Sequence, residues 1–327
     1  MLVNTLYVIG NGFDLAHDLK TSYWDFREFL DKQYPDFLSS FEELYYIGRI
    51  DLEDPRVSDD ARRRWEESVK FTLWSDFENK IGQPNISEME DFSASILADL
   101  DLDSGPIGIE DTMDAYWEKQ YGYVNSFEQY VREWIESVDT SRVKPRRRAL
   151  IGSDDFFATF NYTNLLENVY RIEDVLHIHG GISSVTNTAP IMGHCNKNDI
   201  ENFARQAKQA DEKFSEGEAS IKRAIANYLE SIYKDTEFII HSNYLFWNKL
   251  QDVNKVVIFG LSAGEGDLPY LRKIQESVKS NAKWDVYYYD EDARFKLSRV
   301  MQKKLIEKTV LHIFHPTNFG IDKRTER

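Results

Sequence analysis

The stretch LYVIGNGFD, residues Leu6–Asp14, joins a short apolar run to a turn that contains two glycines. Apolar runs of this length that end at a glycine are typical of buried strands. The segment Ser22–Tyr34 that follows has aromatic and aliphatic residues at helical spacing. We therefore expect a strand, a glycine turn and a helix in that order. Such a turn brings backbone amides close to a ligand, and the start of a helix attracts anions.

Similar runs recur in the second half of the chain, with helical segments between most of them. The strand-like runs are Phe156–Phe160, Val175–His179, Val256–Gly260, Trp284–Tyr289 and Val310–Phe314. The helical segments are Asn164–Arg171, Ile200–Leu250, Leu268–Asn281 and Asp292–Lys308. Alternation of strands with helices predicts a three-layer α/β fold with a mainly parallel sheet of about six strands.

The interval between the first two expected strands has a different character. Residues 41–150 contain helix-like runs, Arg62–Ile81 and Met113–Val138, and no convincing strand. We therefore expect an α/β domain of residues 1–40 and 151–327, with a helical insertion at 41–150 that forms a lid or an oligomer interface. Within the insertion, the acidic run Ile81–Trp117 and the basic run Arg142–Arg148 are typical of solvated surface, with partner or phosphate binding as the alternative.

Composition limits the class of protein. The chain has 327 residues, of which 42% are hydrophobic and 14% aromatic, and a net charge of −16. The apolar fraction can fill a large core, and the negative field disfavours a general nucleic-acid binder. A single cysteine, Cys195, allows no internal disulfide. No signal peptide and no apolar run of about 20 residues is present, so we expect a cytoplasmic protein without a membrane segment.

Glycines and polar residues gather where three of the expected strands end. The turn Gly10–Asp14 follows the first strand, Asn161 follows the second, and Gly260 with Ser262 follows a later one. Ligands of open parallel sheets bind outside the carboxyl ends of the strands, which predicts one composite nucleotide site. A tight turn at the glycines, and helix caps at Asn161 and Ser262, are the structural alternatives.

Two histidines belong to the next expected strand exit, in the sequence VLHIHG. His179 lies at the exit itself, whereas His177, on the same strand face, is interpreted as a core residue. An imidazole can act as a base near neutral pH, and the amide of Asn161 can orient a water or a sugar hydroxyl. Adjacent strand ends would deliver both groups to one crevice.

Five motifs in order resemble the AbiH family of bacteriophage abortive-infection proteins. They are GNGFDLAH with TSYWDF, LWSDFENKIG (Leu73–Gly82), TFNYTNLLE, VLHIHG and VVIFGLSAGEGDLPYL, and they extend from Tyr7 to about Leu271. AbiH proteins in turn look like distant relatives of sirtuin-like NAD-binding domains. The resemblance implies a Rossmann-like, sirtuin-like fold and NAD as the ligand.

The same resemblance implies roles for individual residues. Asn161 matches the sirtuin-like catalytic Asn, and His179-Gly180 matches the catalytic His-Gly pair. The glycine turns would hold the cofactor, with these residues as its binding set: Gly10, Asn11, Gly12, Phe13, Asp14, Ser22, Tyr23, Gly180, Gly260 and Ser262. Protein deacylation is disfavoured, because the zinc module of deacylating sirtuins needs four cysteines and this chain has one.

Asp14 departs from the sirtuin-like pattern, in which a serine is usual. A carboxylate about 5 Å from a phosphate charge costs roughly 3 kcal/mol at an effective dielectric constant near 20. We therefore expect Asp14 to cap a helix, bind ribose hydroxyls or meet a cation. A metal site made by Asp14, His17 or His194 with Cys195 is a further alternative that no spacing compels.

Three functions follow as hypotheses. The first is an antiphage effector that binds NAD and hydrolyses its nicotinamide–ribose bond, with His179 and Asn161 as catalytic residues. The second is a nucleotide-sensing or scaffold module that binds without turnover and acts through a partner protein. The third is a nucleic-acid hydrolase, which the negative charge disfavours and the basic run Arg142–Arg148 favours. The phage trigger is not identified by the sequence.

Overall fold

The computed structural model describes residues 4–48, 50, 54–91, 115, 117–119, 121–145, 155–182, 189–262, 264–288, 291–300 and 311–314. The chain divides into two compact units. The first contains Met1–Ser22, Val131–Ile191 and Asp235–Arg327, and the second contains Tyr23–Tyr130 and Met192–Lys234. Each unit is therefore built from separate stretches of the chain.

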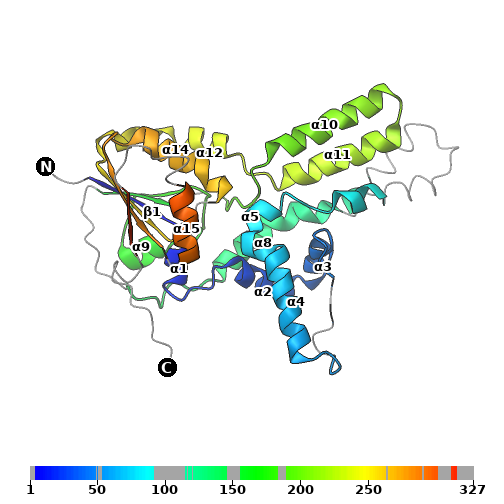
Figure 1. Cartoon of the computed structure of the whole chain (residues 1–327), viewed down its shortest axis with the longest axis horizontal. Coiled ribbons are helices and arrows are strands. Elements are labelled where there is room, and N and C mark those ends of the chain that lie inside the picture. The colour runs from blue at the N-terminus through cyan, green and yellow to red at the C-terminus, as the bar shows by residue number, and fades with distance from the viewer. Residues whose placement is uncertain are drawn as a thin grey trace. The chain divides into compact units, whose positions relative to one another are not determined.

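The first unit is organised around a parallel sheet (Figure 1). Strands β1 to β5 are Thr5–Ile9, Phe156–Thr159, Val175–His177, Lys255–Phe259 and Lys283–Tyr287, in the spatial order β3-β2-β1-β4-β5. Strand β6 (Leu311–Phe314) pairs in parallel with β5. This order is that of doubly wound dinucleotide-binding folds, in which the switch point lies between β1 and β4. The expected α/β class, the parallel sheet and its strands are confirmed.

Side-chain alternation along the strands creates two cores, one on each face of the sheet. Leu6, Val8, Val256 and Ile258 pack with helices that include α12 (Thr236–Ser242), α13 (Tyr244–Lys249) and α14 (Leu268–Ser277). Ile9, Phe157 and Phe259 pack with α1 (Asn11–Leu15) and α9 (Leu165–Tyr170). Figure 1 shows α12 and α14 on one face and α9 on the other. Because neighbours along a strand point to opposite faces, helices cover both sides.

The second unit is helical. Its described part includes the helices α2 (Tyr23–Gln33), α3 (Pro35–Glu43), α4 (Asp59–Thr72), α5 (Phe77–Lys80), α10 (Lys197–Glu212) and α11 (Glu216–Ser231), with a 3₁₀ turn, η1, at Trp74–Asp76. Helix α8 (Phe127–Glu136) follows the 3₁₀ turn η3 (Gly122–Ser126) and contains the boundary with the first unit. Helix α15 (Glu291–Val300) and the 3₁₀ turns η4 (Leu250–Asp252) and η5 (Glu265–Asp267) complete the first unit.

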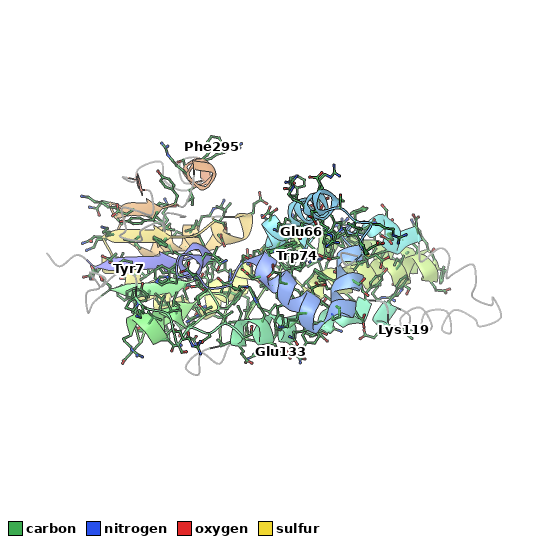
Figure 2. All side chains as sticks on the ribbon, turned by 90° about the horizontal axis from the view of Figure 1, so that it is seen from below. Tyr7, Glu66, Trp74, Lys119, Glu133 and Phe295 are labelled. Carbon is green, nitrogen blue, oxygen red and sulfur yellow. The ribbon has the colours of Figure 1, made fainter. Side chains whose placement is uncertain are left out.

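Aromatic packing and a buried ion pair hold the helical unit together. The rings of Trp74 and Phe77 stack at 4.7 Å, and Phe41 lies within 6.2 Å of both (Figure 2 labels Trp74). The Arg27 guanidinium donates from Nε and Nη2 to the Glu42 carboxylate at 2.7 and 2.9 Å. Trp74 Nε1 donates to the same carboxylate at 2.7 Å. This carboxylate therefore accepts three hydrogen bonds in a desolvated site.

Replacing Glu42 by alanine is expected to destabilise the protein by about 3–5 kcal/mol, because it leaves a buried guanidinium without its counter-charge. Arg27 is 6% exposed and Glu42 is 2% exposed, so water cannot substitute for the lost carboxylate. Glu43→Ala, at the exposed neighbouring position of the same helix, is the control and should change stability by less than about 0.5 kcal/mol. Urea unfolding measures both, and equal effects would contradict the assignment.

The unit boundaries differ from the domain boundaries expected from the sequence. Residues 23–40 and 192–234, expected in the α/β domain, lie in the helical unit, and residues 131–150, expected in the insertion, belong to the first unit. The role of residues 41–150 as a lid or oligomer interface stays a prediction. Most of the acidic run, and residues 146–148 of the basic run, lie outside the described residues. Among the residues that are described, no helix has both the length and the apolar character to cross a membrane.

Candidate functional site

The strand exits expected to form a site are neighbours in the sheet. Ile9 is aligned with Thr159 on β2 and with Phe259 on β4, and Thr159 is aligned with His177 on β3. The strands are parallel, so the residues that follow these four positions leave the sheet at one edge. The sheet therefore brings together the first glycine turn, the Asn161 segment, the histidine pair and the second glycine turn.

The two glycine turns contact each other through their backbones. Gly10 N donates to Phe259 O, and Gly12 N donates to Gly260 O, both at 2.8 Å. A Cβ atom at Gly12 would lie 2.7 Å from Gly260 Cα, and one at Gly10 would lie 2.6 Å from Gly260 O. Gly260 has a φ of +68°, which L side chains rarely adopt. Close approach of two backbones at the switch point is thus a sufficient reason for glycine at these positions.

This contact changes what Gly12→Val can test. From the sequence alone, we expect the substitution to abolish nucleotide binding and leave the fold mostly intact. In the structure a β-branched side chain meets main-chain atoms of Gly260, which cannot rotate away. The variant would disturb the β1–β4 junction, so loss of binding would not by itself demonstrate a phosphate contact.

Other residues expected to bind the cofactor have structural partners of their own. Asn11 and Thr21 exchange hydrogen bonds, from Asn11 Nδ2 to Thr21 O at 2.8 Å and from Thr21 Oγ1 to Asn11 Oδ1 at 2.7 Å. Phe13 is buried beside Phe259 and Tyr170. Ser262 Oγ donates to Asp267 at 3.4 Å, as expected for a capped loop before α14.

The remaining members of that set occupy turns or the helical unit. Gly180 has a φ of +69° in the turn after β3. Ser22 is half-buried just before α2. Tyr23 begins α2 and packs its ring against Phe77 at 5.2 Å, within the helical unit.

Asn161 is anchored at three of its four hydrogen-bonding groups. Its backbone N donates to Thr159 Oγ1 at 3.0 Å, its backbone O accepts from His177 Nδ1 at 3.1 Å, and its Nδ2 donates to Asp14 Oδ1 at 2.7 Å. The fourth group, Oδ1, is buried and has no hydrogen-bond partner among the described residues. A buried acceptor without a partner costs about 1–3 kcal/mol, so it calls for an explanation.

Asp14, the side-chain partner of this asparagine, is 1% exposed. Its carboxyl group accepts from Asn161 Nδ2 and from Thr163 Oγ1, the latter at 2.6 Å. Burial raises the pKa of the Asp14 carboxyl to about 7, while hydrogen bonds from Thr163 and Asn161 and the nearby His177 act in the opposite direction. These contacts are not those of a helix cap, and they make Asp14 the centre of a buried polar network. Binding of ribose hydroxyls or of a cation by Asp14 stays a prediction.

His177 belongs to the same network. Its Nδ1 faces the Asn161 carbonyl and its Nε2 lies 2.6 Å from Glu167 Oε1. Both ring nitrogens face oxygen acceptors, so a proton must lie between Nε2 and Oε1 while Nδ1 donates. His177 is buried, as expected, but its partners are polar. Glu167 was not expected at the site, and Thr163 drew notice only because sirtuin-like sequences usually have Asp at its position. The polar residues Thr159, Asn161 and Thr163 alternate in TFNYTN, which is the signal that could have grouped them.

His179, the expected catalytic base, has a different environment. It is 3% exposed, and its ring lies edge-on to Phe160 at 5.2 Å and near Tyr270 at 5.5 Å. These rings belong to the core on the α12–α14 face, whereas Phe13 and Leu165, near Asp14 and Asn161 in the chain, belong to the opposite core. The structure thus places His177, and not His179, in hydrogen-bond contact with Asn161.

The residues considered for a metal site are engaged elsewhere. His17 Nδ1 donates to Phe13 O at 2.7 Å, and Tyr170 Oη contacts His17 Nε2 at 2.7 Å. His194 Nε2 donates to Leu229 O and its Nδ1 accepts from Asn196 N. Burial lowers the pKa of His194, which agrees with a neutral ring. Within the described ranges, no group of three His, Cys, Asp or Glu residues could hold a metal ion.

Asp14 is expected to make stability depend on pH. Its pKa near 7 in the folded chain, against 3.8 as the ordinary value, corresponds to about 4 kcal/mol. The folded state holds the proton to higher pH, so this stabilisation is present at pH 4 and is lost as the pH rises to 7. Asp14→Asn cannot titrate at this position. As the pH rises from 4 to 8, the unfolding free energy of the wild type should therefore fall relative to that of Asp14→Asn. Parallel plots of unfolding free energy against pH for the two proteins would contradict the raised pKa of Asp14.

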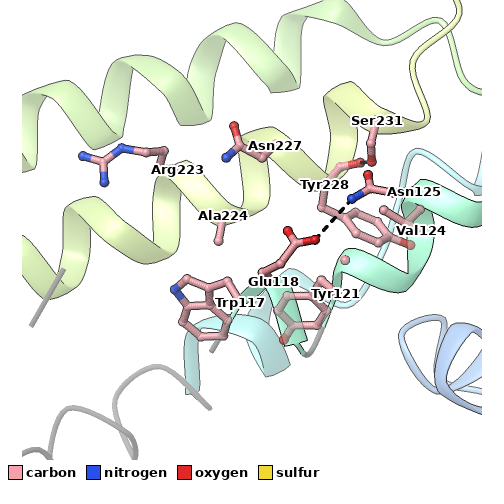
Figure 3. A pocket seen from close by; sticks show the side chains of 11 residues that line it. Trp117, Glu118, Tyr121, Val124, Asn125, Arg223, Ala224, Asn227, Tyr228 and Ser231 are labelled. Carbon is pink, nitrogen blue, oxygen red and sulfur yellow. Dashed lines mark hydrogen bonds between the residues drawn. The ribbon is translucent and has the colours of Figure 1, made fainter. Parts of the chain in front are cut away.

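A separate cavity of about 220 Å³ lies in the helical unit (Figure 3). Trp117 and Tyr121 stack at 5.6 Å on one side, and Asn125 Nδ2 donates to Glu118 Oε1 at 3.5 Å. The lining residues are Trp117, Glu118, Tyr121, Gly122, Val124, Asn125, Arg223, Ala224, Asn227, Tyr228 and Ser231. None of the site residues expected from the sequence lines it.

Comparison with known proteins gives a family and no individual relative. A family model described as "Bacteriophage abortive infection AbiH" matches residues 6–288. No match was found among curated proteins or among solved structures. The matched range includes the glycine turns, Asp14, Asn161, His177 and His179.

Proposed function

Since the chain belongs to the AbiH family of bacteriophage abortive infection proteins, we propose that it binds NAD at the carboxyl edge of its parallel sheet and hydrolyses the nicotinamide–ribose bond. Hydrolysis would deplete NAD in an infected cell. A phage component or a partner protein would start the reaction, and a homo-oligomer could form the active species. Such contacts would fit the expected role of residues 41–150 as a lid or oligomer interface.

The fold supports a nucleotide as ligand. The strand order β3-β2-β1-β4-β5-β6 is that of dinucleotide-binding sheets, whose ligands lie outside the carboxyl ends of the strands. Asn161 follows β2 and His179-Gly180 follows β3, in the order that resembles sirtuin-like domains. NAD as the ligand rests on that resemblance.

The single observation that carries the proposal is the state of Asn161 Oδ1. It is a buried acceptor without a partner among the described residues, on a side chain held by Asp14. Enzymes prepare hydrogen-bonding groups for the transition state before the substrate arrives, so an unused and fixed acceptor at a strand exit is a typical catalytic feature. A water molecule or a ribose hydroxyl supplies the donor that this oxygen lacks.

The chemistry needs one positioned water and one base. Water attacks C1′ of the nicotinamide ribose, and the C1′–N bond breaks with its electron pair going to the pyridinium nitrogen, so nicotinamide leaves as a neutral base. The proton of the water passes to the imidazole of His179 and then to solvent. Asn161 Oδ1 accepts a hydrogen bond from the attacking water or from a ribose hydroxyl, which keeps the reactants in line.

A nucleotide sensor that binds without turnover is the second candidate, because His177, and not the expected base His179, makes the hydrogen bond to Asn161. Asp14, Asn161 and His179 are 1%, 6% and 3% exposed. A substrate can reach them only after a local rearrangement, which a trigger would have to provide. A sensor needs the same binding site but no attacking water.

Incubation of the purified full-length chain with NAD distinguishes the two functions. The proposal expects free nicotinamide and ADP-ribose in equal amounts, measured by chromatography, either with the protein alone or in lysates of phage-infected cells. Binding of NAD without release of nicotinamide under either condition would support the sensor. Failure to bind NAD under either condition would reject NAD hydrolysis, and a sensor would then have to bind a different nucleotide.

A further inference from the structure

We propose that Asp14 is a positioning residue for Asn161, and that together with Thr163 it fixes the Asn161 amide so that Oδ1, not Nδ2, faces the ligand. The inference deepens the proposed function and rests on it for the identity of the ligand. The orientation itself rests on contacts within the chain. Asp14 Oδ1 lies 2.7 Å from Asn161 Nδ2, and Asp14 Oδ2 lies 2.6 Å from Thr163 Oγ1.

The donor and acceptor roles follow from the chemistry of the groups. An ionised carboxylate only accepts hydrogen bonds, so the NH₂ of Asn161 must face Asp14 and the amide oxygen must face away. Thr163 can donate to the second carboxylate oxygen, which keeps the carboxyl plane from rotating. Asp14 and Thr163 are 1% and 4% exposed, so water does not compete for these bonds.

Protonation of Asp14 preserves this orientation. A proton on Oδ2 can be donated to Thr163 Oγ1, because a hydroxyl both donates and accepts. Oδ1 then continues to accept from Asn161 Nδ2. Among the described residues, the titratable groups that act on the Asp14 carboxyl are His177 on β3, which lowers its pKa, and Glu167 on α9, which raises it. The amide is therefore held through the pH range in which Asp14 titrates.

The consequence concerns the class of ligand. Because Asn161 Nδ2 donates to Asp14, the group of Asn161 that remains for a ligand is the acceptor Oδ1, which needs an O–H or N–H donor. A water or a sugar hydroxyl fits, whereas a phosphate oxygen does not. An ionised Asp14 carboxylate would repel a pyrophosphate. Because Asp14 is 1% exposed and hydrogen-bonds to Asn161, the group that meets the ligand is Asn161 and not Asp14.

Side-chain amide exchange of Asn161 tests the orientation without any ligand. The full-length chain is labelled with ¹⁵N-asparagine, and the Asn161 signal is assigned by its loss in Asn161→Asp. Asp14→Ala should accelerate exchange of the Nδ2 protons at least about tenfold, because one charge-assisted hydrogen bond is lost. Asp14→Asn should restore protection, since its Oδ1 can accept from Asn161 while its Nδ2 donates to Thr163. Asp18→Asn, at an exposed carboxylate four residues away, is the matched control.

Unchanged exchange in Asp14→Ala would overturn the proposal. If Asp14→Ala does not fold, the pH dependence of the Asn161 Nδ2 chemical shift decides the question. The titration should be present in the wild type and in Asp18→Asn, and absent in Asp14→Asn. A titration that persists in Asp14→Asn and disappears in Glu167→Gln would assign it to the His177–Glu167 pair and would overturn the role of Asp14.

The activity measurement separates this proposal from the proposed function. With NAD as substrate, Asp14→Ala should lower kcat at least about tenfold with little change in Kd, and Asp14→Asn should recover most of the loss. If the wild type neither binds nor cleaves NAD, the proposed function fails, and amide exchange alone decides the positioning role. An active wild type with the same kcat in Asp14→Ala would reject the positioning role alone.

Discussion

Replacing Asn161 by alanine is expected to lower the rate of NAD hydrolysis by at least ~100-fold, the usual effect of losing one positioned polar group. The variant removes Oδ1, which is the buried acceptor without a partner among the described residues. It also leaves Asp14 with Thr163 as its remaining side-chain donor, so stability should be measured beside activity. NAD affinity should change much less than kcat, because the lost contact acts mainly in the transition state.

His179→Ala is expected to have an effect of the same size, because general base catalysis is typically worth about 10²–10⁴-fold. The ring is 3% exposed against Phe160 and Tyr270, so alanine would also leave a cavity. His179→Gln fills more of that space and separates loss of the base from loss of packing. His177→Ala is the comparison variant, and we expect it to act through stability.

Full NAD turnover after removal of both Asn161 and His179, in an active wild-type background, would refute their catalytic roles. A larger loss in His177→Ala than in His179→Ala, at equal stability, would transfer the base to the histidine that contacts Asn161. Both results are read from initial rates of nicotinamide release by variants that unfold at the same urea concentration.

Gly260→Ala is expected to destabilise the α/β unit by about 3 kcal/mol or more, or to prevent its folding. The φ of +68° strains any L side chain, and the new Cβ would lie 2.6 Å from both Gly12 Cα and Phe13 N. Both are main-chain atoms at the β1–β4 junction, so relief requires the two loops to separate. The contact joins residues about 250 positions apart, and its loss should reduce the cooperativity of unfolding.

Gly48→Ala provides the matched control, because nothing lies within 4 Å of the Cβ it would add. Its unfolding free energy should differ from that of the wild type by less than about 0.5 kcal/mol. Urea unfolding followed by far-UV circular dichroism measures both variants. Equal midpoints for Gly260→Ala and Gly48→Ala would show that the two glycine turns do not approach each other as described.

Local pattern was enough to find the strands. The runs LYVIG, FFATF and VVIFG are short and apolar, and each is followed by or ends in a glycine or a polar residue. The structure has a strand within one residue of the expected bounds of each run. The helix-like run Arg62–Ile81 was less well predicted. Helix α4 ends at Thr72, and Phe71 is 77% exposed whereas Trp74 and Phe77 are buried. A break in the helix rotates the later residues onto a different face.

The sequence by itself determined the α/β class, the parallel strands and the gathering of polar residues at one edge of the sheet. These features depend on hydrophobic periodicity and on the rule that parallel strands end together. Only the tertiary structure decided which histidine contacts Asn161, what surrounds Asp14, and why Gly12 and Gly260 are glycines. These outcomes depend on contacts between segments more than 100 residues apart for Asp14 and the glycines, and on the turn after β2 for His177. A local sequence pattern carries no information about the distance between two segments that are far apart in the chain. The close packing of the folded protein determines that distance.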